Sequence, residues 1–447
     1  MDMFVVQGGT PLSGSLQVSG AKNACLPIMA AALVIQGTTR LERVPDLVDV
    51  RTLSLLLRNL GVAVDREATG DLALDPAGLH SNIADYDLVR TMRASVCVLG
   101  PLLARTGRAC VSLPGGCNIG FRPIDLHLKG LSALGADVRI ERGYVLAEAK
   151  RLRGARVHLA GPQGTTVTGT CNVLVAAALA EGTSVIEAAA SEPEVVDLAN
   201  FLNACGAQIR GQGTSEIEVD GVDSLRAPSK PYTVIPDRIE AATLLIAAAA
   251  TGGEIQLQDV QPRHLHAVLH ILREAGCRLD VGDSSISLTA PAEIHPVDVV
   301  AQPFPAVPTD VQAQLTALLT KARGTSIVRD DVFPDRFLHL PELSRLGADM
   351  RREGNAVVIR GVQRLSGAPL MASDLRASAA LVIAAMMAEQ ESTIRRIYHL
   401  DRGYERLEAK LSAIGGLVNR VKDEPTHLPI SLPSDPAIHA GSERKSA

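Results

Sequence analysis

The sequence predicts an α/β protein of two domains, each containing three copies of one repeated unit. Two observations support this prediction. A helix-like phrase that ends in Leu-Gly or a close variant recurs along the chain, and an almost wholly apolar segment precedes each copy. The glycines that end the phrases are separated by 74, 71, 70, 71 and 68 residues. They are Gly61, Gly135, Gly206, Gly276, Gly347 and Gly415.

Each unit contains, in order, a buried helix, a strand, an amphipathic helix and further strands. The apolar segments, such as TVTGTCNVLVAAALAEG, are apolar on every side, which is typical of buried helices. Short β-rich runs such as GEIQLQDV follow them. In the Leu-Gly phrases apolar residues recur at i, i+3, i+4 and i+7, with charged residues opposite. The closing glycine suits the left-handed position after a helix.

The repeats also suggest where the domains divide. The stretch at about residues 222–238 is rich in proline and poor in apolar residues, which favours a linker. We expect one domain at residues 21–230 and a second built from residues 1–20 and 231–423, with residues 1–20 supplying strands. Residues 424–447 are polar and rich in proline and serine, so we expect a disordered tail.

Composition excludes several classes of protein. The 447 residues carry a formal net charge of −5, and aromatic residues make up 2%. Neither value favours a nucleic-acid-binding protein. The seven cysteines are odd in number and form no C-x-x-C pair, which argues against a disulfide framework or a zinc site and favours a reducing compartment. We see no secretory signal and no apolar run of 18 residues, so we expect a cytoplasmic protein without membrane spans.

Charged residues gather in the first turns of the buried helices. N-capping explains the Asp and Asn residues there, but not the Lys and Arg residues, which the helix dipole disfavours. Cations at several helix starts suggest an anionic ligand, and hence a cationic cleft with a few carboxylates between two facing domains. Arg402 stands at the expected start of a charge-rich helix. The other residues concerned are Lys22, Asn23, Arg93, Asp237, Arg238, Asp310, Asp374 and Arg376.

A glycine-rich loop carries a second candidate group. Cys117 follows Pro114-Gly115-Gly116 and precedes Arg122, so an accessible thiol beside a guanidinium is expected; a buried structural cysteine is the alternative. For Cys25, Cys97, Cys171, Cys205 and Cys277, inside apolar helices, we expect burial. His266 and His270 have the spacing of a metal pair, but a solvated helix face explains them better, and we expect no metal and no cofactor. Neither nucleotide-binding glycine motif is present.

The motifs SGAKNA, TMRAS, SLPGGCNIGFRPIDLH, SEPEVVDLANFL, PDRIEA, PTDVQAQ, DLRASAALV and IYHLDRGYERLE carry a resemblance over nearly the whole chain except the tail. The chain resembles the UDP-N-acetylglucosamine enolpyruvyl transferases (1-carboxyvinyltransferases) of peptidoglycan synthesis. The resemblance implies two inside-out α/β domains, each of three βαβαββ-type units. It implies that phosphoenolpyruvate adds through C2 to a sugar 3-hydroxyl while C3 is protonated, and that the resulting ketal loses phosphate. It also implies alkylation by the epoxide fosfomycin.

The resemblance also implies roles for individual residues. Cys117 is the expected general acid, and Asp310 is expected at the attacking hydroxyl. The cationic cradle for phosphoenolpyruvate matches Lys22, Arg122, Arg376 and Arg402. Asn23 and Arg93 face the second substrate, and Val332 touches its sugar. The segment that holds the uridine nucleotide matches Arg122, Pro123, Ile124, Asp125 and Leu126. Further charged positions that line the cleft match Asp49, Asp374, Arg336, Glu192 and Asp237.

Some positions differ from the family pattern. Phe121 stands where a small residue is common, Val48 where a polar or basic one is frequent, and residues 164–168 lack the lysine that some members present to the nucleotide. The leading hypothesis is transfer to UDP-N-acetylglucosamine. The alternative is a paralogue acting on another nucleotide such as UMP; shikimate 3-phosphate is a weaker candidate because that sister family lacks the loop cysteine. A binding protein without turnover is the non-enzyme alternative, which Cys117, Asp310 and Arg402 argue against.

Overall fold

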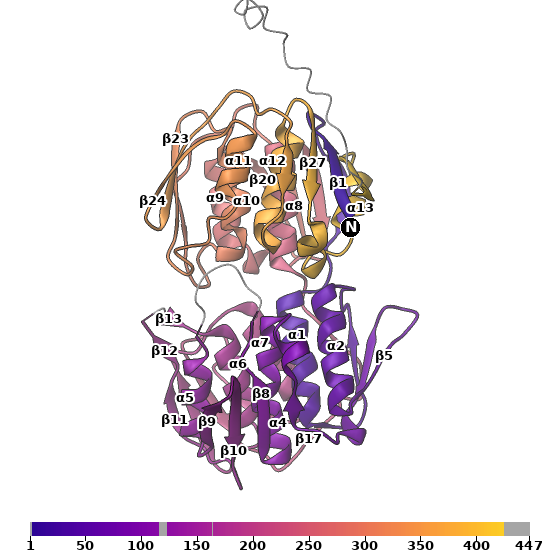
Figure 1. Ribbon diagram of the computed structural model, residues 1–447, viewed down its shortest axis with the longest axis vertical. Coiled ribbons are helices and arrows are strands. Elements are labelled where there is room, and N and C mark those ends of the chain that lie inside the picture. Colours follow the sequence, from indigo (N-terminus) through magenta and orange to yellow (C-terminus); the bar gives the residue numbers. More distant parts are fainter. Residues whose placement is uncertain (1, 116–122, 163, 424–447) are drawn as a thin grey trace, which may run out of the picture.

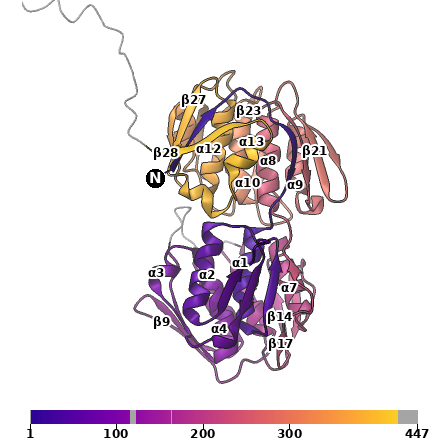
Figure 2. The ribbon, with the colours of Figure 1, turned by 90° about the vertical axis from the view of Figure 1, so that its right-hand side faces the viewer.

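The computed structural model describes residues 2–115, 123–162 and 164–423, which form two lobes arranged end to end (Figures 1 and 2). Each lobe has its own buried apolar cluster. The first cluster runs from Ala21 to Val234, and the second combines residues 4–18 with residues 239–418. We call these parts the first and second lobes. The exact domain limits given above stay a prediction.

The first lobe contains three four-stranded sheets among the described residues. In each, the first two strands are parallel and the remaining neighbours are antiparallel. The strand orders are β18(Tyr232–Thr233)-β4(Thr39–Glu42)-β6(Leu72–Asp75)-β5(Ala63–Arg66), β7(Ile83–Ala84)-β8(Arg108–Ser112)-β10(Tyr144–Glu148)-β9(Asp137–Glu141) and β11(Arg156–His158)-β14(Thr183–Glu187)-β16(Glu216–Asp220)-β15(Gln208–Arg210). Two-stranded pairs add β17(Leu225–Arg226)-β3(Ile35–Gln36) and β12(Ala160–Gly161)-β13(Gly164–Thr165).

The second lobe repeats this pattern, with two strands supplied by the N-terminal segment. Strand β1 lies beside β27 (Figure 1) and pairs with both β27 and β28, and β2 pairs with β19. The strand contribution expected of the first 20 residues is therefore present. The described sheets are β2(Ser13–Gln17)-β19(Glu254–Gln258)-β21(Ser285–Thr289)-β20(Arg278–Val281), β22(Val299–Ala301)-β23(Thr325–Asp330)-β25(Ala356–Arg360)-β24(Asp349–Glu353) and β26(Pro369–Met371)-β27(Glu391–Arg395)-β1(Asp2–Gln7)-β28(Leu417–Lys422).

The apolar segments form the buried helices that the sequence predicts. Every residue of α8 is buried, and α8, α10 and α12 pack against one another inside the second lobe, as α4 and α6 do in the first. Burying a helix on all sides explains its lack of a polar face. These helices are α1(Lys22–Ala31), α4(Leu99–Thr106), α6(Val167–Ala177), α8(Arg238–Ala250), α10(Thr309–Leu319) and α12(Leu375–Met387).

The Leu-Gly phrases form the second helix of each unit. In α2, Val50, Leu53, Leu57 and Leu60 are buried at helical spacing. All the glycines that end these phrases have positive φ, between 90° and 104°, which confirms the predicted helix ends. The helices are α2(Val48–Leu60), α5(Asp125–Ala133), α7(Pro193–Ala204), α9(His266–Glu274), α11(Leu340–Arg345) and α13(Leu407–Ala413).

One apolar segment departs from a regular α-helix. It begins as the 3₁₀-helix η3(Arg93–Val98) and continues as α4. The side chain of Asn172 causes the break: its Nδ2 donates to the Val96 carbonyl at 2.9 Å and its Oδ1 accepts from Gly100 N–H at 2.8 Å. The amide group therefore replaces the backbone hydrogen bond that would join Val96 to Gly100.

The remaining short helices are α3(Tyr86–Val89), η1(Ala32–Val34), η2(Pro76–Gly78), η4(Pro262–His264) and η5(Ile397–Arg402). None of the helices in the described ranges is long and apolar enough to cross a membrane.

Candidate active site

A cleft of about 930 Å³ lies between the lobes and is lined by residues from both. The starts of the buried helices meet there: α1 contributes Lys22 and Asn23, α10 contributes Asp310, and α12 contributes Arg376. The sequence-based prediction that charged helix starts converge on one cleft is therefore confirmed for these residues.

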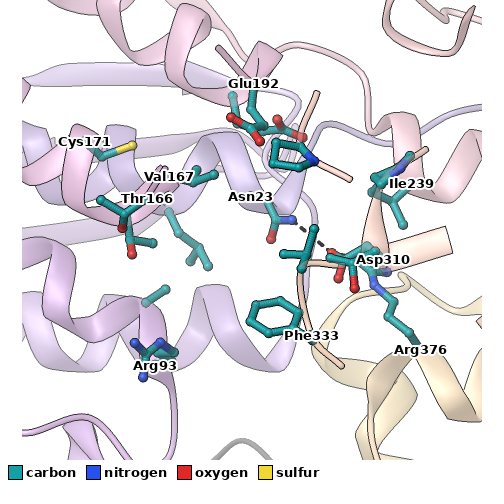
Figure 3. Close-up of a pocket in the computed structure, with 18 of the residues that line it drawn as sticks. Asn23, Arg93, Thr166, Val167, Cys171, Glu192, Ile239, Asp310, Phe333 and Arg376 are labelled. Atoms are coloured by element: carbon teal, nitrogen blue, oxygen red, sulfur yellow. Dashed lines mark hydrogen bonds and ion pairs between the residues drawn. The ribbon is translucent and has the colours of Figure 1, made fainter. Parts of the chain in front are cut away.

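Asp310 lies at the centre of a charged cluster. Its Oδ1 is 2.7 Å from Arg336 Nη1, and its Oδ2 is 3.0 Å from Arg376 Nη2. From the first lobe, Asn23 Nδ2 donates to Oδ2 at 3.4 Å, so this contact joins the two lobes (Figure 3). Figure 3 shows Asn23 between the first-lobe residues Thr166 and Val167 and the second-lobe residues Asp310 and Arg376.

The electrostatics of this cluster favour an ionised carboxylate and further anions. Burial raises the pKa of Asp310, but the guanidinium groups of Arg376 and Arg336 hold that pKa well below its usual range. Arg376 is only 1% exposed. In the described part of the chain, Arg376 Nε and Nη1 and Arg336 Nε are buried without a hydrogen-bond partner. Unpaired buried donors are costly, so the cluster is suited to an anionic ligand.

A second ion cluster also joins the lobes. Asp49, on α2, has its Oδ2 3.2 Å from Lys22 Nζ and its Oδ1 2.9 Å from Arg402 Nε. Lys22 and Asp49 belong to the first lobe and Arg402 to the second. The Asp49 carboxylate therefore holds two cations side by side at the cleft wall.

A third contact between the lobes, the ion pair of Arg238 and Glu194, is not predicted by the sequence analysis. Arg238 and Glu194 form a buried pair, with Nε 2.9 Å from Oε1, and the Arg238 guanidinium lies over the Phe304 ring. Phe304 N–H donates to Glu192 Oε1 at 3.4 Å. Burial raises the pKa of Glu192. PDRIEA and SEPEVV marked the segments concerned, but no local signal pairs residues 44 positions apart.

The first lobe alone forms one end of the cleft. Arg93 Nη2 donates to the Pro123 carbonyl at 3.2 Å and so ties η3 to the start of α5, where Asp125 and Leu126 line the cleft. The Leu126 side chain lies next to Gly161, in the β12–β13 hairpin. Residues 164–168 continue the same wall. Their lining side chains are small, and none is basic.

Comparisons with known proteins agree with this architecture. A curated relative from Myxococcus xanthus (strain DK1622), named UDP-N-acetylglucosamine 1-carboxyvinyltransferase, is 50% identical over 426 residues, which cover 94% of this chain and 100% of the relative. A relative of the same name from Dichelobacter nodosus (strain VCS1703A) is 51% identical over 423 residues, covering 95% of this chain and 100% of its own. The chain belongs to the UDP-N-acetylglucosamine 1-carboxyvinyltransferase family.

The wider family and its fold are equally clear. The family model described as EPSP synthase (3-phosphoshikimate 1-carboxyvinyltransferase) matches residues 6–411. The solved enolpyruvyl transferase NikO from Streptomyces tendae superposes with a TM-score of 0.85 at 26% identity, covering 94% of this chain and 99% of its own. EPSP synthase from Acinetobacter baumannii shares the fold, with a TM-score of 0.71 at 16% identity and coverage of 94% and 100%. The predicted enolpyruvyl transferase fold is confirmed.

Most residues that the family resemblance selected lie on the cleft wall. They are Lys22, Asn23, Asp49, Arg93, Pro123, Asp125, Leu126, Glu192, Asp310, Val332, Arg336, Asp374, Arg376 and Arg402. Val332 is positioned because its N–H donates to Asp330 Oδ1 at 2.9 Å. Asp374 caps α12 by accepting from Arg376 N–H and Ala377 N–H. Cys117, Phe121 and Arg122 lie outside the described residues.

Three positions differ from expectation. Ile124 is 7% exposed and belongs to the first core instead of the cleft wall. Asp237 caps α8 and accepts from Lys22 N–H at 3.2 Å, so its carboxylate is used by backbone groups and does not line the cleft. Arg402 ends η5 instead of beginning a helix, since α13 starts at Leu407.

The cleft is also more acidic than expected. Among its described lining residues, Asp and Glu are as numerous as Lys and Arg, because buried cations without a ligand require protein counter-charges. The cysteines expected to be buried are buried, and two of them, Cys97 and Cys171, lie at the cleft wall. His270 is exposed and contacts Glu274. No cluster of three or more His, Cys, Asp or Glu residues suited to a metal ion occurs in the described ranges.

Proposed function

We propose that this protein transfers the enolpyruvyl group of phosphoenolpyruvate to the 3-hydroxyl of UDP-N-acetylglucosamine and releases phosphate. The names of relatives that are 48–51% identical over their whole length support this acceptor. The observation that carries the proposal is the Asp310 cluster, in which a carboxylate, two guanidinium groups and Asn23 from the facing lobe converge. The product would be the first committed precursor of peptidoglycan.

Asp310 is the proposed base for the sugar hydroxyl. A carboxylate whose pKa is strongly lowered accepts a proton poorly. Anionic phosphoenolpyruvate offers Arg376 and Arg336 another partner, which weakens their hold on Asp310 and raises its pKa when substrate binds. The Asp310 carboxylate therefore becomes a stronger base when phosphoenolpyruvate binds.

The cations supply charge neutralisation. Lys22, Arg376 and Arg402, together with Arg122 by resemblance, are the proposed contacts of the phosphate and carboxylate groups of phosphoenolpyruvate. These groups converge from both lobes, so they favour the charge that develops when the ketal loses phosphate. Cys117 is the proposed acid that protonates C3.

Acceptor-dependent phosphate release tests the proposal. We expect phosphate release from phosphoenolpyruvate with UDP-N-acetylglucosamine and none above background with UMP, shikimate 3-phosphate or no acceptor. A rate with UMP that exceeds the rate with the UDP-sugar would reject the proposed acceptor and favour the paralogue hypothesis.

The role of Cys117 has its own test. Because a serine hydroxyl is a much weaker acid than a thiol, we expect Cys117→Ser to lower kcat at least about 100-fold. Fosfomycin should add once to the wild-type protein at Cys117, as peptide mass spectrometry would show. The half-buried Cys110 offers a matched control, and Cys110→Ser should change neither result. Unchanged turnover of Cys117→Ser would rule out the acid role.

A cytoplasmic location and the absence of a nucleic-acid partner stay predictions. The proposed substrates are small molecules, and the described helices contain no membrane span.

A further inference from the structure

A buried polar chain links the first-lobe core to the cleft wall. It begins at Asn172, whose amide group replaces the hydrogen bond between Val96 and Gly100. Because Gly100 N–H can only donate and the Val96 carbonyl can only accept, the Asn172 side chain has one permitted orientation. The close approach of Asn172 needs a glycine at position 100, since a Cβ there would lie 2.2 Å from the backbone carbonyl oxygen of Asn172.

The fixed amide determines the tautomer of His127. The second hydrogen of Asn172 Nδ2 points to His127 Nδ1 at 2.8 Å, so Nδ1 must accept and carries no hydrogen. The hydrogen of the neutral ring therefore resides on Nε2. His127 is 1% exposed, and burial, aided by the charge of Arg93, lowers its pKa to about 3. The ring stays neutral throughout the physiological pH range.

The tautomer in turn determines what Thr168 can do. His127 Nε2 lies 3.1 Å from Thr168 Oγ1, and since the hydrogen is on Nε2, the histidine donates and the hydroxyl accepts. Within residues 2–115, 123–162 and 164–423, the structure gives the Thr168 hydroxyl no other hydrogen-bond partner. Thr168 lines the cleft, so its hydroxyl hydrogen is available to a ligand.

This hydroxyl lies at the first-lobe end of the cleft. His127 directly follows Asp125 and Leu126 on α5, and Thr168 directly follows Thr166 and Val167 on α6. Figure 3 shows Thr166 and Val167 on the side of the cleft opposite Asp310 and Arg376. With the reacting hydroxyl at Asp310, as proposed above, the Thr168 hydroxyl lies on the side of the cleft where a remote part of the acceptor substrate would bind.

We propose that Thr168 donates a hydrogen bond to an oxygen of the nucleotide part of the acceptor substrate, and that His127 is the positioning residue that keeps the Thr168 hydroxyl a donor. This inference rests on the proposed function, because it assumes a nucleotide acceptor. The Thr168 hydroxyl would then select ligands by hydrogen-bond polarity. It would bind a ligand with an accepting oxygen at this place and disfavour a ligand with a donor there, such as an amino group.

Substitution of Thr168 tests the donor. We expect Thr168→Val, which keeps the shape, to raise KM for UDP-N-acetylglucosamine about 10-fold while KM for phosphoenolpyruvate stays within about 2-fold. Thr168→Ser should restore most of the affinity. Thr325→Val, the same change at an exposed strand position remote from the cleft, should have no effect. An unchanged KM in Thr168→Val, or a Thr168→Ser variant as weak as Thr168→Val, would overturn the proposal.

Calorimetric titrations with uridine, UMP and UDP separate the sources of the oxygen without any turnover. An affinity loss in Thr168→Val with all the ligands places the bond on the nucleoside, and a loss only with UMP and UDP, or only with UDP, places it on a phosphate. Equal affinity of wild type and Thr168→Val for every ligand would refute the bond. Failure of the wild type to turn over the UDP-sugar would instead refute the proposed function.

The Nε2–H tautomer of His127 can be identified from its ¹⁵N chemical shifts, and a histidine with a purely structural role would not need this tautomer. In ¹⁵N-histidine-labelled protein we expect His127 as the Nε2–H tautomer, with no titration between pH 5 and pH 9. Assignment uses a His127→Gln variant. An Nδ1–H tautomer, or a protonation step near pH 6.5, would overturn the positioning role.

Discussion

At the scale of single residues, Asp310 combines two properties that normally oppose each other. It sits in a buried cluster, which disfavours charge, yet Arg376 and Arg336 keep its pKa well below the usual range. Its single negative charge in turn offsets part of the charge of the two guanidinium groups. The residue therefore affects both stability and turnover.

Replacement of Asp310 by Asn should separate these effects. We expect kcat to fall about 100- to 1,000-fold, because the base is lost. A carboxylate with a lowered pKa stabilises the fold above its unfolded-state pKa of about 4, and this stabilisation is lost as pH falls through the folded-state value. Thermal unfolding from pH 7 to pH 3 should therefore show a smaller loss of Tm on acidification for Asp310→Asn than for wild type.

A matched change serves as the control for Asp310. Asp298→Asn alters a carboxylate that accepts from Ile327 N–H at an exposed position remote from the cleft. It should leave turnover unchanged. Activity of Asp310→Asn close to that of wild type would contradict the assignment of the base.

The charged helix starts are predictable from the sequence, but the pairs that they form are not. Lys22 and Arg376 could be predicted because the helix dipole disfavours a cation in the first turn, and Asp310 because the motif PTDVQAQ carries the family resemblance. The Arg238–Glu194 pair and the link from Asn172 through His127 could not, because each depends on the tertiary approach of segments whose own patterns are ordinary.

At the scale of elements, the glycine that ends each Leu-Gly phrase adopts the same positive-φ conformation in every repeat, but its neighbours differ. Gly61 has φ of 104° and Gly206 has φ of 99°, which side chains rarely adopt. A Cβ on Gly61 would lie 2.3 Å from the Gly78 carbonyl oxygen, whereas a Cβ on Gly206 would meet nothing within 4 Å.

Alanine substitutions should separate the cost of backbone strain from the cost of a steric clash. We expect Gly206→Ala to lose about 1–2 kcal/mol of unfolding free energy from backbone strain alone. Gly61→Ala should lose more, because its Cβ also displaces backbone at Gly78. Urea unfolding of both variants measures the difference, and a smaller loss for Gly61→Ala would contradict the argument.

The boundaries of some helices could not be predicted from the local sequence pattern. The six repeats and their glycine ends followed from spacing, since periodicity survives in the sequence. The 3₁₀ start of η3 did not, because the Asn172 side chain that interrupts it comes from another unit. Arg402 was placed on a helix start because charged residues around it continue the helical spacing of α13.

At the scale of the whole molecule, the chain crosses between the lobes twice, and ion pairs join the two lobes at the cleft. Strands β1 and β2 belong to the second lobe, while β18 completes a sheet of the first. Asp49 then links Lys22 to Arg402 across the cleft. Closure therefore depends on an ion pair that also lines the proposed phosphoenolpyruvate site.

Loss of the Asp49 charge should open the molecule. We expect Asp49→Asn to have a larger radius of gyration than wild type without ligand, and to lower kcat/KM for phosphoenolpyruvate about 10-fold or more. Asp220→Asn removes a carboxylate that pairs with Arg210 within the first lobe, and it should change neither. Identical scattering curves for Asp49→Asn and wild type would contradict the link between charge and closure.

The most direct test of the central claim is identification of the product. Wild-type protein should convert UDP-N-acetylglucosamine and phosphoenolpyruvate into one product, whose NMR spectrum shows a vinyl group attached through oxygen at the sugar C3, with one equivalent of phosphate. An unmodified sugar after complete incubation, or an enolpyruvyl group at any other position, would contradict the account.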